Sequence, residues 1–137
     1  MTLTLGGGFS VGERRRDADR DLAAAAGVTV KAVRYYEGQG LLKPRRAANG
    51  YRVYDAEDVV IVREVKALLS LGLTAEQTYP FIECLRAGND RADVCPASLT
   101  AYRIRIAEVE QRIDELTALR ERLTGLLTDA ESWRTNE

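Results

Sequence analysis

The 137-residue chain contains no histidine, two cysteines, one methionine and one tryptophan. Without histidine, the Ser-His-Asp arrangement and the most common general base are absent, so we expect no enzyme of those kinds and predict that the chain is not an enzyme. Two cysteines are too few for a four-ligand zinc site within one chain. We therefore expect no metal site, no cofactor and no need for a disulfide framework.

The sequence also lacks any run of about 18 apolar residues, which predicts that no helix crosses a membrane. At the N-terminus, MTLTLGGGFSVGERRR places its positive charges after a mildly apolar stretch, the reverse of a signal peptide. These features favour a cytoplasmic protein without a membrane partner.

Charge is unevenly distributed along the chain. Residues 1–55 carry ten Lys and Arg against six Asp and Glu, a net charge of +4, whereas residues 56–137 carry ten against fifteen, a net charge of −5. A basic front half followed by an acidic back half indicates a part that binds a polyanion and a solvated helical part.

Two helices are predicted on either side of a turn at Gly27. The first ends in AAAAGV, because alanine favours helix and glycine commonly follows a helix end. Thr29 is the expected N-cap of the second, VKAVRYYEGQG. This spacing is typical of a helix-turn-helix, with Lys31, Arg34 and Tyr35 on a basic and aromatic face suited to a DNA groove.

A two-stranded wing is predicted next. Asn49-Gly50 is the strongest hairpin signal in the chain, and the residues after it alternate with a period of two. Further on, Asp55 is expected to cap a helix, and Thr74 with Gln77 fits a capping box for another. Pro80 should kink that helix or end its first part.

From Pro96 onward the chain reads as one long helix. Apolar residues recur at alternating steps of three and four, with Arg120 as the polar exception, a heptad pattern that requires a partner helix. The expected dimerisation residues are Leu99, Tyr102, Ile106, Val109, Ile113, Leu116, Leu123 and Leu127.

The segment AGVTVKAVRYYEGQGLLKPRRAANGYRVYDAEDV closely resembles the DNA-binding domain of the MerR family of bacterial transcription regulators. The later LGLTAEQ and the long helix are similar to the same family, so the resemblance covers roughly residues 22–128. It implies a mainly α fold: a winged helix-turn-helix followed by helices and a long C-terminal helix that forms an antiparallel coiled coil. It also implies a homodimer that binds a pseudo-palindromic promoter element, bends and untwists the DNA, and acts with RNA polymerase.

The resemblance carries a set of DNA-binding residues onto this chain. Arg34 and Tyr35 match the groove-entering pair, whereas Tyr36 reads as core or mixed. Tyr54 is either core or contact, and the loop arginines either bind phosphate or are merely solvated. The full predicted set is Thr29, Lys31, Arg34, Tyr35, Arg45, Arg46, Tyr51, Arg52 and Tyr54.

Two features depart from the family. RRRDADRD intervenes between Glu13 and Leu22, so either the first helix is extended or the first strand is displaced, and Arg14 to Arg16 either add phosphate contacts or are solvated. Cys95 matches a metal-ligating position of the metal-sensing branch, but no Cys or His follows the long helix. Cys84 and Cys95 are therefore either inert thiols, an oxidisable pair acting as a thiol sensor, or, for Cys95, part of a dimer site.

The expected organisation is a flexible N-terminus (1–12), the winged helix-turn-helix (13–72), a linker helix region (73–95), the dimerisation helix (96–128) and a short tail (129–137). Two rival functions stay open from the sequence. One is an architectural or excisionase-like DNA-binding protein without effector control. The other is a helical interaction protein whose basic segment is incidental.

Overall fold

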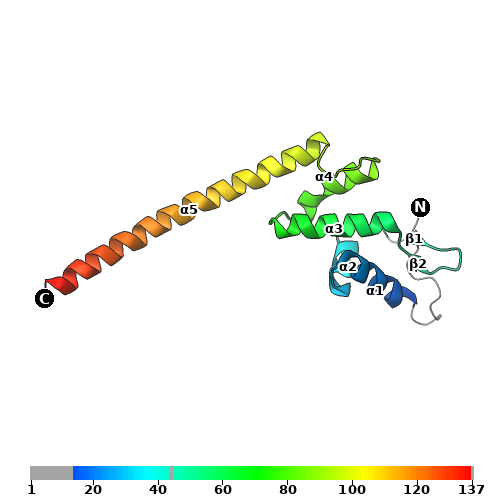
Figure 1. Ribbon diagram of the computed structural model, residues 1–137, viewed down its shortest axis with the longest axis horizontal. Coiled ribbons are helices and arrows are strands. Elements are labelled where there is room, and N and C mark those ends of the chain that lie inside the picture. The colour runs from blue at the N-terminus through cyan, green and yellow to red at the C-terminus, as the bar shows by residue number, and fades with distance from the viewer. Residues whose placement is uncertain (1–13, 44, 137) are drawn as a thin grey trace. The chain divides into compact units, whose positions relative to one another are not determined.

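The computed structural model describes residues 14–43 and 45–136, including all side chains in these ranges except those of residues 14–17 and 52. The predicted flexible segment 1–12 lies outside the described residues. The fold is mainly helical, as predicted (Figure 1). Its elements are α1 (Arg14–Ala26), α2 (Val30–Gly38), β1 (Arg45–Arg46), β2 (Arg52–Val53), α3 (Ala56–Ser70), α4 (Ala75–Arg86) and α5 (Pro96–Thr135).

Helices α1 and α2 form the helix-turn-helix. Because α1 already begins at Arg14, the RRRDADRD stretch extends the first helix, one of the two arrangements the sequence left open. Thr29 caps α2 as predicted, since its side chain accepts a hydrogen bond of 3.0 Å from the Ala32 N–H. The turn between the helices is closed by a bond of 2.9 Å from the Val28 N–H to the Ala23 carbonyl.

Basic side chains from α3 satisfy the C-terminal end of α1. Arg63 donates to the Ala25 carbonyl at 2.7 Å, and Lys66 donates to the Gly27 carbonyl at 2.7 Å. The last carbonyls of a helix have no partner inside it and carry partial negative charge, so cations are stabilising there. Two positive charges of the acidic half of the chain are thereby used to hold α1 on α3.

Helices α3 and α4 begin with reciprocal caps. Asp55 and Asp58 form one capping box, and Thr74 and Gln77 form the predicted second one. Pro80 does not end its helix, because α4 continues through it to Arg86. Each box satisfies the N–H of the cap residue and that of the third residue after it, which favours starting each helix at this point.

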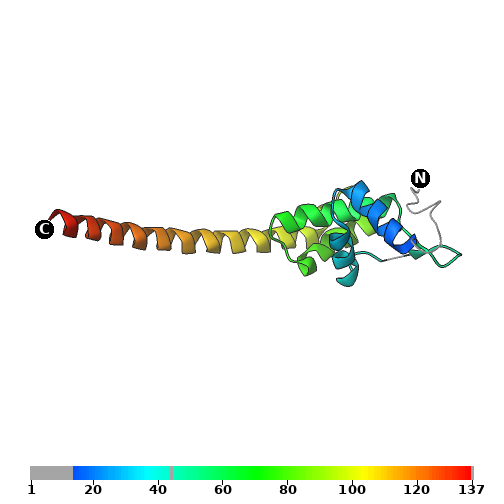
Figure 2. The same cartoon turned by 90° about the horizontal axis from the view of Figure 1, so that it is seen from below.

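The first compact unit of the chain comprises residues 1–101. Its core lies between α1, α2, α3, α4 and the residues that flank the wing. Helix α1 contacts α2 and α3, and α3 also contacts α4 (Figures 1 and 2). At about 25 cal/mol per Å² of apolar surface removed from water, this burial is the main stabilising contribution. Its largest fully buried side chains are Tyr54, Phe81, Leu22, Leu41, Leu42, Ile61, Leu68, Ile82, Val33, Val62, Val65 and Thr78.

The chain forms two compact units. The chain separates into residues 1–101 and 102–137, because α4 packs on α3 and supplies Ile82 to the core. The segment 73–95 is therefore part of the first unit. Helix α5 is one uninterrupted helix to Thr135, so most of the expected tail is helical (Figure 2). Within the described residues, no helix is long and apolar enough to cross a membrane.

Candidate nucleic-acid interface

Helix α2 presents two different faces. Val33 and Tyr36 are buried against the rest of the unit, and burial, followed by the nearby Tyr35, raises the pKa of the Tyr36 hydroxyl. Lys31 and Arg34 are exposed, and Tyr35 is 50% exposed. Two cations and an aromatic ring on one exposed helix face are suited to binding an anionic partner such as a nucleic acid.

A polar cluster lies at the inner edge of this face. The Arg34 Nε is 3.6 Å from the carboxylate of Asp19 on α1, and this carboxylate is only 1% exposed. The Tyr54 hydroxyl donates to Asp19 at 3.1 Å and is also bonded to Glu37. The cluster joins α1, α2 and the residue after β2, so the wing and the helix-turn-helix are linked through side chains.

The wing is anchored by Arg45. Its guanidinium lies 2.8 Å from Asp58 and also pairs with Asp55, the two members of the α3 capping box. Burial alone would lower the pKa of Arg45, but the bonds to Asp58 and Asp55 raise it on balance. Burial raises the pKa of Asp58, whereas for Asp55 the hydrogen bonds from Asp58 and Arg45 outweigh burial and lower its pKa.

The wing turn has a form that the sequence only partly predicted. The strands pair antiparallel, Arg45 with Val53 and Arg46 with Arg52. Gly50 has a φ of +84°, but no described non-glycine residue, Asn49 included, has a positive φ. A bond of 2.9 Å from the Gly50 N–H to the Ala47 carbonyl closes a turn that ends in a left-handed glycine. Asn49 instead accepts from the Tyr51 N–H at 3.2 Å.

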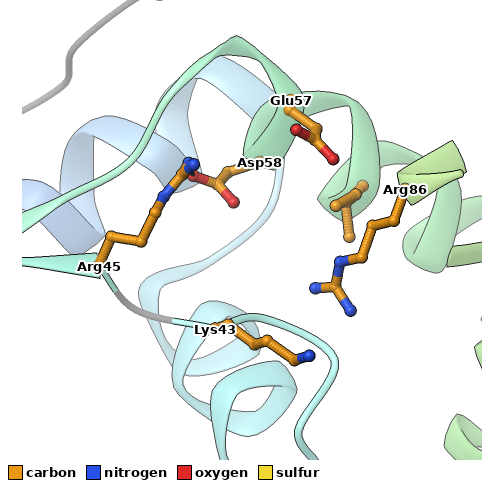
Figure 3. A pocket seen from close by; sticks show the side chains of 6 residues that line it. Lys43, Arg45, Glu57, Asp58 and Arg86 are labelled. Atoms are coloured by element: carbon orange, nitrogen blue, oxygen red, sulfur yellow. Dashed lines mark hydrogen bonds and ion pairs between the residues drawn. The ribbon is translucent and has the colours of Figure 1, made fainter. Parts of the chain in front are cut away.

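A shallow cavity of about 230 Å³ lies beside the wing anchor (Figure 3). Its lining mixes three cations with two carboxylates, and Arg86 there donates to the Leu41 carbonyl at 3.0 Å. Arg45 points toward Asp58, and Lys43 lies on the opposite wall in Figure 3. Since the charges partly neutralise one another, the cavity reads as a packing feature at the base of the wing. It is lined by Lys43, Arg45, Glu57, Asp58, Ile61 and Arg86.

Comparison with known proteins agrees with this geometry. Residues 20–78, from α1 into α4, match the MerR HTH family of regulatory proteins. The HTH-type transcriptional regulator HmrR of Rhizobium leguminosarum bv. viciae is 35% identical over 106 residues, which cover 74% of this chain and 77% of HmrR. This chain belongs to the MerR family.

Two further known proteins are similar to this chain. Nodulation protein NolA of Bradyrhizobium elkanii is 33% identical over 88% of this chain, but the match spans only 62% of NolA, so NolA is the longer protein. The crystal structure of the transcription regulator PbrR691 from Ralstonia metallidurans CH34 in complex with lead(II) has a TM-score of 0.61 and 27% identity. That match covers 79% of this chain and 82% of PbrR691.

The MerR-type site residues predicted from the sequence fall into different environments. Lys31, Arg34, Tyr35 and Arg46 are exposed, and Tyr51 is half-buried. Tyr54 is 1% exposed, and its hydroxyl is bonded inside the unit, which favours core over contact, the two roles that the sequence left open for it. The side chains of Arg52 and of Arg14 to Arg16 lie outside those that the structure describes.

Some residues of the site could not be found from the sequence. Asp19 reads as one more charge in RRRDADRD, and Asp58 as an ordinary acidic residue in a first helical turn. Their partners Arg34 and Arg45 are 15 and 13 positions away along the chain. No local spacing rule connects residues so far apart, so these pairs depend on the packing of the elements.

The two cysteines are joined as a disulfide between the end of α4 and the residue before α5. Their Cα atoms are 5.9 Å apart, a usual separation for a disulfide. Cys84 is 2% exposed and Cys95 is half-buried. Among the described residues, no group of three or more His, Cys, Asp or Glu side chains is arranged to hold a metal.

Helix α5 leaves its apolar side chains in water. Seven of the eight predicted dimerisation residues are between 40% and 61% exposed, and Tyr102 is half-buried. A second row was missed: Leu119, Leu126 and Trp133, spaced by seven, are 50%, 64% and 68% exposed. These three occupy the heptad position beside the predicted seam and broaden it in its C-terminal half.

Proposed function

We propose that this chain is a DNA-binding transcription regulator of the MerR type, whose exposed α2 face enters the major groove of promoter DNA. The observation that carries the proposal is the exposure of Lys31, Arg34 and Tyr35 on the second helix of a helix-turn-helix, with a basic wing anchored in the same unit. A helix in the major groove reads base edges, while the flanking cations bind phosphates. Members of the family regulate transcription and are not enzymes.

The proposed assembly is a homodimer joined by antiparallel α5 helices. Its support is the exposed heptad seam, since an apolar stripe of this length is stable in water only when a second helix covers it. Two-fold symmetry then requires a pseudo-palindromic operator. The dimer would bend and untwist the promoter, so that RNA polymerase, in the cytoplasm, can use it.

The DNA contacts proposed are Lys31, Arg34 and Tyr35 on α2, with Arg46 and Tyr51 in the wing. Thr29 contributes through the N-terminal end of α2, whose free N–H groups attract phosphate. Arg45 is held by Asp55 and Asp58, so we assign it to the anchoring of the wing. Arg52 stays a prediction from the family motif.

The experiment is a footprint, together with fluorescence anisotropy, of the purified chain on the DNA upstream of its own gene. One protected palindrome, bound tightly and with steep salt dependence, is the expected result. Protection without regard to sequence would favour the architectural or excisionase-like alternative. No salt-dependent binding to any duplex would overturn the proposal and leave a helical interaction protein.

A matched pair of variants locates the surface. Lys31→Ala should lower the slope of log affinity against log salt by about one for each protomer that loses a phosphate contact. Arg122→Ala removes the same charge from the exposed outer face of α5 and should leave the slope unchanged. Equal effects of the two variants would show that only net charge matters.

A further inference from the structure

Asp19 is a buried carboxylate that the proposed DNA contact does not itself use. It lies in α1 within the RRRDADRD stretch, and only 1% of it is exposed. Burying a carboxylate is costly unless charge and hydrogen bonds compensate it. Two of its partners belong to the DNA-binding elements: the Arg34 Nε at 3.6 Å and the Tyr54 hydroxyl at 3.1 Å.

The geometry leaves the functional end of Arg34 available. The ion pair to Asp19 uses Nε, while the Arg34 side chain remains 59% exposed. A guanidinium has N–H groups on Nε and on two terminal nitrogens, held in one rigid plane. Fixing Nε on a buried anchor therefore orients the terminal nitrogens as well, and reduces the rotamer entropy that Arg34 would lose on binding a ligand.

We propose that Asp19 is a positioning residue for DNA binding, which holds Arg34 in the orientation that contacts the duplex. Tyr54 adds the wing to the same arrangement, because its hydroxyl is bonded to Asp19 and to Glu37. The inference rests on the proposed function, since it assigns a role to a residue behind the DNA-binding face. It differs from that function in naming an acidic residue as necessary for affinity.

Asp19 could affect DNA binding through its charge alone or by positioning Arg34. The two explanations predict opposite changes in DNA affinity when the carboxylate is neutralised. A carboxylate near a phosphate backbone repels it, so neutralising an acid on α1 should tighten DNA binding if charge alone matters. If Asp19 positions Arg34, its neutralisation should weaken binding. Asp21, two residues further along α1 and half-buried, provides the matched control for loss of one negative charge from the same helix.

The test compares Asp19→Asn with Asp21→Asn by anisotropy on the footprinted operator, at several salt concentrations. Asparagine keeps the shape and an oxygen to which Tyr54 can donate. We expect Asp19→Asn to weaken binding by about three- to tenfold. Asp21→Asn should leave affinity unchanged or slightly higher. If Asp19→Asn binds as well as Asp21→Asn while the wild type binds specifically, the inference fails and the proposed function stands.

A double-mutant cycle separates positioning from a general loss of fold. In an Arg34→Gln background, Asp19→Asn should cause no further loss of affinity, because the residue it positions is absent. Equal losses in both backgrounds would overturn the proposal. Thermal unfolding of each variant shows whether it is folded at the temperature of the binding measurement.

A measurement on the wild-type protein covers the case in which Asp19→Asn does not fold. In the free protein, the Arg34 Nε–H should give a resolved NMR signal that exchanges more slowly than those of fully exposed arginines, since the ion pair at 3.6 Å to a buried carboxylate restrains the guanidinium. Arg34→Lys, which keeps the charge at an exposed position, assigns that signal by its loss. An Arg34 Nε–H that exchanges as fast as those of the exposed α5 arginines would refute the pairing.

Discussion

Arg34 and Arg45 are two arginines of one basic segment that have different surroundings. Arg34 is paired through Nε to one buried carboxylate, which leaves most of its side chain exposed. The Arg45 guanidinium is shared between Asp55 and Asp58, and these bonds hold the wing on the start of α3. Both are arginines of the same sequence motif, so the sequence predicts the same role, DNA contact, for each. Their different roles follow from which carboxylates lie within reach of each guanidinium.

Gly40 and Gly38 make a test of backbone conformation two positions apart. Gly40 has a φ of +76°, and a Cβ there would come within 2.8 Å of the Tyr79 hydroxyl, which is bonded to the Gln39 carbonyl. Gly40→Ala should therefore lower the free energy of unfolding by about 1–2 kcal/mol or more. Gly38 is helical with open space around it, so Gly38→Ala should raise that free energy by about 0.5–1 kcal/mol.

Urea unfolding of both glycine variants gives the comparison. Opposite signs are expected, and each should appear as a change in midpoint with little change in slope. A destabilised Gly38→Ala would mean that the end of α2 is not helical in solution. A Gly40→Ala variant as stable as the wild type would contradict the left-handed conformation of Gly40 itself.

Glu64 on α3 makes stability depend on pH. Burial raises the pKa of its carboxyl, and the negative charge of Asp93 raises it further. The ionised form is therefore disfavoured in the folded state, so it costs stability at pH values above the raised pKa. Below the ordinary pKa of a glutamate the group is protonated in both states, and the cost disappears.

Glu64→Gln should accordingly stabilise the protein at pH 7.5 by up to about 1 kcal/mol, and the gain should vanish as the pH falls below about 4. Urea unfolding at both pH values measures it. Glu131→Gln, on the exposed end of α5, is the control and should change stability little at either pH. A gain that is the same at both pH values would show that it does not come from charge.

At the scale of the elements, the segment that connects α4 to α5 is held by a disulfide and by hydrogen bonds. The Cys84–Cys95 disulfide closes a segment with a sequence separation of 11 between α4 and α5. Within it, Asn89 donates to the Cys84 carbonyl at 2.9 Å, and Ser98 on α5 donates to the Ala92 carbonyl at 2.7 Å. The bond therefore strengthens a segment that already has internal hydrogen bonds.

Reducing the disulfide should destabilise the first unit by about 2–3 kcal/mol, because the unfolded chain regains the freedom that a closed loop removes. Thermal unfolding with and without a phosphine reductant measures the effect. The double variant Cys84→Ser with Cys95→Ser should resemble the reduced protein and be insensitive to reductant. Two titratable thiols in the untreated, denatured protein would contradict the bond.

At the scale of the whole molecule, the proposed dimer depends on a partner helix that covers the exposed seam of α5. Ile113 lies in the predicted seam and is 55% exposed, while Ile104 lies outside the seam at 50% exposure. Ile113→Glu should shift the protein from dimer to monomer, because a buried unpaired carboxylate opposes helix pairing. The similarly exposed Ile104→Glu should leave the dimer intact.

Sedimentation at several concentrations measures the oligomeric state, and anisotropy on the operator measures its consequence. The monomeric variant should lose at least about tenfold in affinity, since the second half-site is no longer held near the first. A wild-type chain that stays monomeric at high concentration would refute the dimer. Monomerisation by both variants would place the interface over a wider part of α5.

The sequence by itself determined the features that depend on residues within a few positions of one another. These are the helical periodicity, the hairpin after Pro44, and the caps at Thr29, Asp55 and Thr74. The family motif is local for the same reason. The hydrogen bond of Tyr54 to Asp19, the anchoring of Arg45 and the pairing of Asp19 with Arg34 join residues 10 to 35 positions apart. Such contacts depend on how α1, α2, the wing and α3 pack together. The free energy that favours these contacts comes from burial and desolvation in the packed structure. It therefore cannot be predicted from the spacing of residues along the sequence.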